Sequence, residues 1–325
     1  MVLDKYYEMS RAELIKSDFW LSEAYNNATK LFPIFIPSYN RYNHMGVLKL
    51  LKSSSINLPV TFVVRKSQYD LYKSNSDLDK YEILSVEDDK ILNLAAVREY
   101  ILQYCIEHNI EKYVTLDDDI VIAGFKVPYI TSTGNKSATT YIDDFGKFFS
   151  MFCEMSDKCF NLDHNVATTG LQVRGNIFPS SPEVVDSDKF AHVIGSSPRS
   201  FVCINMPLYR DSNVHFDVTN GKLVHEDLDS LCQLAIKGYY WCTFEFMFYQ
   251  DEGASTFGFD NMLERAELQV KTMKNKYSDY DFFRVRDGKL SSSDDTRYPT
   301  INIDCRKVRK FIKNNFSEPA KYYKY

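Results

Sequence analysis

Two short acidic runs in this sequence have residue types and spacings that could carry chemistry. The first is the triplet Asp117-Asp118-Asp119, and the second is the run 225–229, His-Glu-Asp-Leu-Asp. Three adjacent carboxylates repel one another, so the triplet costs stability unless a cation lies beside it. Because side chains alternate along a strand, Asp117 and Asp119 can share one Mg²⁺ or Mn²⁺ ion. The alternative is an acidic turn that faces solvent.

The second acidic run precedes a predicted helix over residues 227–237, which Gly238 ends. Carboxylates in the first turn of a helix are stabilised by the helix dipole, so Glu226 and Asp227 could simply cap it. The chemical alternative is that one of them acts as a general base toward an attacking hydroxyl. His225 is a candidate for orienting a phosphate or ligating a metal, and equally for a capping or surface position.

The first acidic run follows one of several predicted strands that alternate with helices. Apolar runs predict strands over residues 31–37, 60–64, 81–86 and 112–116, with helices over 45–52, 68–73 and 92–108. This alternation specifies an α/β fold with a doubly wound sheet, in which ligands bind at the carboxyl ends of strands. Those ends carry the segment 38–41, Arg65 and the acidic triplet, so we predict a binding site at this edge.

The pattern is less regular beyond residue 120. Helices are predicted over 142–159 and 264–277, strands over 168–177, 201–208 and 239–248, and a helical lead-in over 9–30. Because no linker rich in Pro, Gly or Ser interrupts the chain, we predict one domain over residues 1–264 with a C-terminal elaboration over 265–325.

Charge is unevenly distributed along the 325 residues. The chain has 39 Lys+Arg against 44 Asp+Glu, a net charge of −5, and this mild acidity argues against a nucleic-acid partner. However, residues 265–325 carry 15 basic and 8 acidic side chains, whereas residues 1–264 carry 24 and 36. A basic segment therefore follows an acidic body, and it either binds a polyanion or is merely solvated.

Several classes of protein are excluded by composition. Aromatic residues make up 15% of the chain, which is incompatible with disorder. No run of about 18 apolar residues exists, so we expect no membrane partner, and the charged N-terminus is unlike a secretory signal. The seven scattered cysteines are typical of reduced thiols, which predicts a cytoplasmic protein. Glycine-rich phosphate and dinucleotide motifs are absent from the sequence.

The order of these motifs resembles the nucleotide-sugar-dependent glycosyltransferases of the GT-A fold. A strand ending in Pro37-Ser38-Tyr39-Asn40-Arg41 is followed by Arg98 on a helix, by the triplet 117–119 and by the Glu226-Asp227 pair. The resemblance covers roughly residues 30–245 and implies a Rossmann-like mixed sheet flanked by helices. It divides the catalytic domain into a nucleotide-sugar half, about 30–120, and an acceptor half, about 121–264, with 265–325 packed on the same domain.

The resemblance also implies a role for each matching residue. Pro37, Ser38, Tyr39, Asn40 and Arg41 would contact the nucleotide of a UDP-sugar donor. Arg65 and Arg98 would lie near uracil or phosphate, although Arg98 could instead be a surface residue of its helix. Asp117 and Asp119 match the outer positions of an Asp-x-Asp motif that holds Mn²⁺ or Mg²⁺ on the diphosphate, and Asp118 would contact ribose or sugar. Asp227 matches the base of inverting members, with Glu226 beside it.

A narrower resemblance is to phage-encoded glycosyltransferases that modify hydroxymethylated pyrimidines in DNA, a group associated with TET-type oxygenases. It implies double-stranded DNA as the acceptor, a flipped-out base and the cytoplasm of a host cell. Candidates for contacts with the acceptor or its phosphates are His225, Trp241, Arg306, Lys307, Arg309 and Lys310. Trp241 could equally lie in the core. A polysaccharide, lipid or protein acceptor, a retaining course, and a sugar-nucleotide-binding protein without activity stay open as alternatives, as does the oligomeric state.

Overall fold

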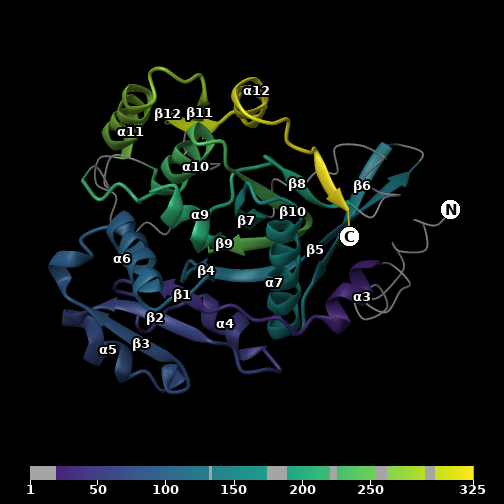
Figure 1. The fold of residues 1–325 in the computed structure, drawn as a ribbon. Coiled ribbons are helices and arrows are strands. Elements are labelled where there is room, and N and C mark those ends of the chain that lie inside the picture. The colour runs from purple at the N-terminus through teal and green to yellow at the C-terminus, as the bar shows by residue number, and fades with distance from the viewer. Residues whose placement is uncertain are drawn as a thin grey trace.

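Parallel strands form one half of a large mixed sheet (Figure 1). The computed structural model describes residues 20–131, 134–173, 189–219, 225–252, 262–289 and 297–324. The parallel strands lie in the order β3 (Glu82–Val86), β2 (Val60–Arg65), β1 (Ile34–Pro37) and β4 (Lys112–Leu116). Strand β1 is buried along its whole length, as its apolar sequence requires. The four strands predicted in this region are confirmed.

Short helices connect the parallel strands. They are α4 (Val47–Lys52), α5 (Tyr69–Lys73) and α6 (Leu94–Glu107), with single 3₁₀ turns at Lys66–Gln68, Ser76–Leu78 and Asp88–Lys90. The side chain of Asn93 caps α6 by accepting a hydrogen bond from the Ala96 amide at 2.9 Å. One face of α6 buries Ile101, Leu102 and Cys105. Helix α6 therefore has a fixed position against the sheet, which matters because it carries Arg98.

Mostly antiparallel pairing extends the sheet beyond β4. The order continues through β9 (Phe201–Asn205), β7 (Val166–Val173), β10 (Tyr240–Asp251), β8 (Lys189–Val193) and β13 (Tyr322–Lys324). Strands β5 (Ile120–Thr131) and β6 (Gly134–Tyr141) form a hairpin that joins β10. Helix α7 (Phe145–Leu162) packs its aromatic face on this half, with the Phe152 ring centroid 4.8 Å from that of Phe201. The α/β mixed sheet flanked by helices is confirmed.

The remaining elements lie toward one side of the sheet in Figure 1, apart from α3 (Trp20–Asn27), which lies near α7. They are α9 (Met206–Asp211), α10 (Glu226–Ile236), α11 (Met262–Lys276), α12 (Cys305–Asn315) and the two-stranded sheet of β11 (Phe283–Lys289) and β12 (Arg297–Ile303). Strand β13 follows α12 and pairs with β8 of the main sheet. None of the helices in the described ranges is long and apolar enough to cross a membrane.

Some sequence predictions need correction. The strand predicted over 201–208 ends at Asn205, because Pro207 lies in the first turn of helix α9 and cannot donate a ladder hydrogen bond. The helix predicted over 142–159 is shifted to Phe145–Leu162, since Asp144 caps it. The lead-in over 9–30 and the strand over 168–177 lie partly outside the described residues, and their described parts are α3 and β7.

Candidate functional site

The acidic triplet forms a turn between β4 and β5, held by three separate segments. The Asp117 amide donates to the carbonyl of Ser200 at 3.0 Å, in the segment just before β9. The Val47 amide, at the start of α4, donates to the carbonyl of Asp118 at 3.1 Å. The Glu252 amide donates to the carbonyl of Asp119 at 2.9 Å. The turn therefore presents its carboxylates from a fixed backbone at the carboxyl end of β4.

Asp118 and Asp119 share the guanidinium of Arg41, which follows β1. Arg41 Nη1 lies 3.5 Å from Asp118 Oδ1, and Nη2 lies 3.7 Å from Asp119 Oδ2. The Ser38 hydroxyl donates to Asp118 Oδ2 at 2.5 Å. Burial raises the pKa of Asp118 to about 7, although the hydrogen bond from Ser38 and the charge of Arg41 oppose this shift. The ends of β1 and β4 thus meet here, as predicted.

Arg98 joins the acidic turn to the second acidic run. Its side chain on α6 is only 7% exposed, which excludes the alternative that Arg98 is a surface residue of its helix. Arg98 Nη2 lies 3.3 Å from Asp117 Oδ1, and Nη1 lies 3.0 Å from Glu226 Oε1. One buried guanidinium therefore brings two acidic segments together that are more than a hundred residues apart in the chain.

Glu226 and Asp227 begin helix α10 with opposite electrostatic surroundings. Burial raises the pKa of Glu226 to about 7, with Arg98 opposing the shift. Burial would also raise the pKa of Asp227, but the guanidinium of Arg199 first, and then His225 and Arg98, outweigh it and leave the pKa below its ordinary value. Asp227 is therefore the carboxylate that stays ionised at neutral pH.

Arg199 is a functional candidate that the sequence analysis missed. Its Nε lies 3.4 Å from Asp227 Oδ2, while Asp227 Oδ1 accepts a hydrogen bond from the Leu228 amide at 2.9 Å. Arg199 precedes β9 in an irregular segment and belongs to no recognisable motif. The pairing of β9 with β4 brings this segment to the acidic turn.

A divalent cation would suit the carboxylates of Asp117 and Asp119. Burial first, and then the negative charge of Asp117, raises the pKa of Asp119 to about 6, with a further contribution from Asp251. A bound cation would relieve this repulsion, and carboxylate oxygens are the ligands that Mg²⁺ and Mn²⁺ prefer. No group of three potential metal ligands occurs among the described residues. Asp117 and Asp119 could hold such an ion together with ligands from outside the protein.

Tyr39 and Arg65 form an exposed ledge beside Ser38. The Arg65 guanidinium lies 4.3 Å from the centroid of the Tyr39 ring, and Tyr39 is 53% exposed. Arg65 Nη2 also donates a hydrogen bond to the Leu92 carbonyl at 3.0 Å. Asn40 has a φ of 58°, and its amide donates to the Gln68 side chain at 3.0 Å. These residues follow Pro37, the last residue of β1. The predicted nucleotide-contacting residues therefore lie together.

Other predicted contact residues have different surroundings. Trp241 is fully buried and donates from its indole nitrogen to the Ser196 carbonyl at 3.1 Å, which favours the core role over base stacking. On α12, Arg309 donates to the carbonyls of Pro319 and Ala320, and Lys307 pairs with Asp281 at 2.7 Å. Arg306 and Lys310 are exposed. In Figure 1, α12 lies well away from β1 and β2.

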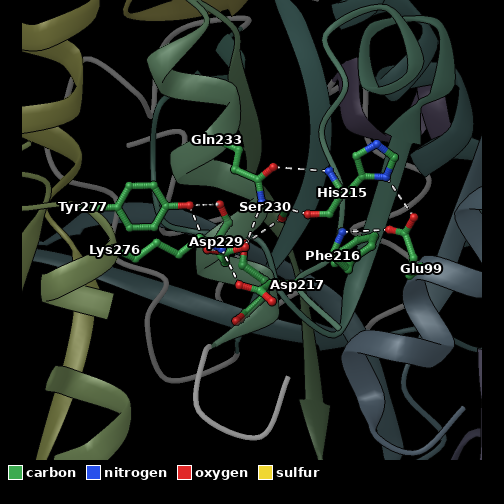
Figure 2. A network of polar contacts seen from close by, with 10 residues as sticks. Glu99, His215, Phe216, Asp217, Asp229, Ser230, Gln233, Lys276 and Tyr277 are labelled. Carbon is green, nitrogen blue, oxygen red and sulfur yellow. Dashed lines mark hydrogen bonds and ion pairs between the residues drawn. The ribbon is translucent and has the colours of Figure 1, made fainter. Parts of the chain in front are cut away.

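A buried polar network fixes helix α10 in place. The Asp229 side chain, which is 0% exposed, accepts hydrogen bonds from Tyr277 and Gln233 and pairs with Lys276, each at 2.8 Å. Figure 2 shows how this network continues through His215 to Glu99 on α6. Helix α10 is thereby tied to both α11 and α6. Asp229 therefore serves the structure, whereas Glu226 and Asp227 in the same turn face Arg98 and Arg199.

We expect Tyr277→Phe to lower the free energy of unfolding by about 1.5–3 kcal/mol, the range for hydrogen bonds to charged groups. The variant removes the hydroxyl that donates to the buried Asp229 carboxylate. Denaturant unfolding measures the effect, with Tyr39→Phe as the control because the Tyr39 ring is half exposed. Equal stability of the two variants would show that the network does not hold α10.

Comparisons with known proteins find structural similarity without a family. No family model matches the chain, and no curated protein matches its sequence. A glucosyl-3-phosphoglycerate synthase from Mycobacterium tuberculosis, solved with Mn²⁺, UDP-glucose and phosphoglyceric acid, has a TM-score of 0.40 at 7% identity over 88% of this chain and 93% of that chain. A mannose-1-phosphate geranyltransferase from Thermus thermophilus has a TM-score of 0.34 at 9% identity over 67% and 75%. A 4-diphosphocytidyl-2C-methyl-D-erythritol synthase from Anaerococcus prevotii has a TM-score of 0.33 at 12% identity over 75% and 96%. Similarity at this level assigns the chain to no family.

Proposed function

We propose that this protein is a metal-dependent glycosyltransferase that moves a sugar from a UDP-sugar to a hydroxyl. The observation that carries the proposal is the position of Arg98, whose guanidinium lies 3.3 Å from Asp117 and 3.0 Å from Glu226. This contact supports the proposal, because a candidate metal ligand and the start of the helix that carries the candidate base then lie on the same guanidinium. A sugar transfer needs both groups within one site.

The donor side uses the ends of β1, β2 and β4. The exposed ledge of Tyr39 and Arg65 offers an aromatic face and a cation to the nucleotide, and Arg41 lies beside Asp118 and Asp119 where a diphosphate would approach. A cation held by Asp117 and Asp119 would offset the negative charge that develops on the leaving diphosphate. Asp118 accepts a hydrogen bond from Ser38 and so holds the acidic turn beside the end of β1.

The acceptor side uses Asp227. The acceptor oxygen would form a bond to the anomeric carbon, the bond from that carbon to the diphosphate oxygen would break, and the hydroxyl proton would pass to Asp227. Such a single displacement inverts the anomeric centre. Asp227 is the residue that the GT-A resemblance matches to the base, and its lowered pKa keeps the carboxylate ionised and able to accept the proton.

As the acceptor we propose a 5-hydroxymethylated pyrimidine in double-stranded DNA, following the narrower resemblance described above. The basic residues 265–325 favour a polyanion, and Arg306 and Lys310 are exposed on α12. Lys307 and Arg309 are already engaged within the chain, so they contribute less to such a surface than the sequence predicts.

The test is UDP release from a panel of UDP-sugars, with and without Mn²⁺, in the presence of DNA that contains hydroxymethylcytosine. Unmodified DNA of the same sequence and a polysaccharide mixture serve as alternative acceptors, and mass spectrometry of the digested nucleosides locates the sugar. We expect Mn²⁺-dependent release that modified DNA stimulates. UDP-sugar binding without release under any of these conditions would identify a sugar-nucleotide-binding protein without activity.

A further inference from the structure

Arg199 is a cation beside the proposed base Asp227, and the proposed function gives it no role in binding the metal or the donor. Its segment is fixed on both sides by the backbone. A Cβ built on Gly170 of β7 would lie 2.3 Å from the Pro198 Cβ, so the segment packs on β7 with no space between them. On the other side, the Ser200 carbonyl accepts the Asp117 amide. The base of the Arg199 side chain is therefore set relative to the acidic turn.

The guanidinium of Arg199 is held at two points and exposed elsewhere. Nε lies 3.4 Å from Asp227 Oδ2, and Nη2 donates to Asn302 Oδ1 on β12 at 3.0 Å. Asn302 is neutral, so Asp227 is the one carboxylate that these contacts place beside Arg199. A guanidinium has five N–H donors, and the side chain is 41% exposed, so donors stay accessible to a ligand. The arrangement orients the group without saturating it.

We propose that Arg199 binds a phosphate group of the acceptor, next to the hydroxyl that Asp227 deprotonates. This inference rests on the proposed function, because it assigns Asp227 as the base. The planar fork of arginine matches phosphate oxygens, and its fixed charge attracts an anion to this side of the site. The substrate class is therefore a hydroxyl compound that also carries a phosphate, either a nucleotide within DNA or a free phosphorylated alcohol.

A different role for Arg199 is to keep Asp227 ionised and oriented. That role would affect all acceptors equally, whereas a phosphate site affects only those that carry phosphate. The decisive quantity is therefore the ratio of kcat/KM for two acceptors that differ by one phosphate, because effects on the base cancel in it.

The experiment compares matched acceptor pairs in the full-length protein with UDP-sugar and Mn²⁺. One pair is 5-hydroxymethyl-2′-deoxycytidine and its 5′-monophosphate, and the other is glycerol and glycerol 3-phosphate. The first pair tests a nucleotide as the source of the phosphate, and the second tests a free phosphorylated alcohol. We expect the wild type to prefer one phosphorylated member by about 10-fold or more, as a charge-assisted hydrogen bond provides. Arg199→Gln should bring that ratio to about 1, and Arg199→Lys should restore part of it.

Arg210→Gln is the matched control, because Arg210 is exposed and pairs with its neighbour Asp211. It should leave the ratio unchanged. A wild-type ratio near 1, a ratio that survives Arg199→Gln, or donor hydrolysis that no phosphorylated member stimulates would each overturn the inference alone. The absence of Mn²⁺-dependent UDP release, with or without acceptor, would instead overturn the proposed function.

Discussion

Asp119→Asn should reduce Mn²⁺-dependent UDP release at least about 100-fold, because a bound metal supplies several kcal/mol of charge stabilisation in the transition state. The turn offers Asp117 and Asp119 as metal ligands, each beside one arginine, whereas Asp118 accepts a hydrogen bond from Ser38 in addition to its contact with Arg41. Loss of one of two protein carboxylates leaves too few ligands to hold the ion against water. The measurement is the initial rate of UDP release over a full Mn²⁺ titration.

The same substitution should leave stability unchanged or higher. Burial and the charge of Asp117 raise the pKa of Asp119 to about 6, so the ionised carboxylate opposes folding above that pH, and a neutral amide removes this penalty. Lost activity therefore cannot come from unfolding. Asp89→Asn, a matched change at an exposed carboxylate, is the control for both measurements. Full activity of Asp119→Asn at saturating Mn²⁺ would remove Asp119 from the metal site.

The parallel half of the fold could be predicted because its inner strands, β1, β2 and β4, are buried on both faces and largely apolar, whereas β3 at the edge is partly exposed. Apolar runs such as 60–64 predict buried strands, and apolar residues at helical spacing between these runs predict the crossover helices of a doubly wound sheet. The site at their carboxyl ends follows from topology alone. Hence the proximity of Ser38, Arg41 and the acidic turn was accessible from the sequence.

The other half depends on tertiary contacts that the local sequence does not specify. Strands β8 and β13 are short, and each is stabilised by pairing with a neighbouring strand, since β13 pairs with β8 and β8 with β10. The β5–β6 hairpin carries Gly124 and Pro128, which weaken a strand pattern, and β6 is largely polar. Helix α9 had one usable signal, Pro207 at its first turn, which the sequence analysis passed over.

The contacts within the site divide in the same way. Acidic runs are easy to recognise in a sequence, so Asp117, Asp119 and Asp227 could be named as candidate site residues. Their ion pairs with arginines could not be predicted, because a lone arginine in a helix or an irregular segment carries no signal of the carboxylate that it will contact. The resemblance places Arg98 near uracil or phosphate, which stays a prediction, and the structure adds its contacts with Asp117 and Glu226; Arg199 is brought to Asp227 by the pairing of β9 with β4.

Asp227→Asn should abolish transfer while leaving the donor bound. General base catalysis contributes roughly 10²–10⁴-fold, so we expect a loss of that size in kcat, with the Kd for the UDP-sugar and Mn²⁺ changed less than about twofold. The amide keeps the volume of the carboxylate and can still accept the hydrogen bond from the Leu228 amide, so the helix start is preserved. Initial rates and isothermal titration calorimetry measure the two quantities separately.

Two comparisons make this result specific to the base. Asp211→Asn breaks the exposed Arg210–Asp211 pair by the same chemical change and should alter neither quantity. Glu226→Gln keeps the side-chain volume and an oxygen that can accept from Arg98, so it should cost less activity than Asp227→Asn if Asp227 is the base. If Asp227→Asn weakens donor binding and transfer by the same factor, Asp227 serves the structure or the metal, and the proton must leave the acceptor by another route.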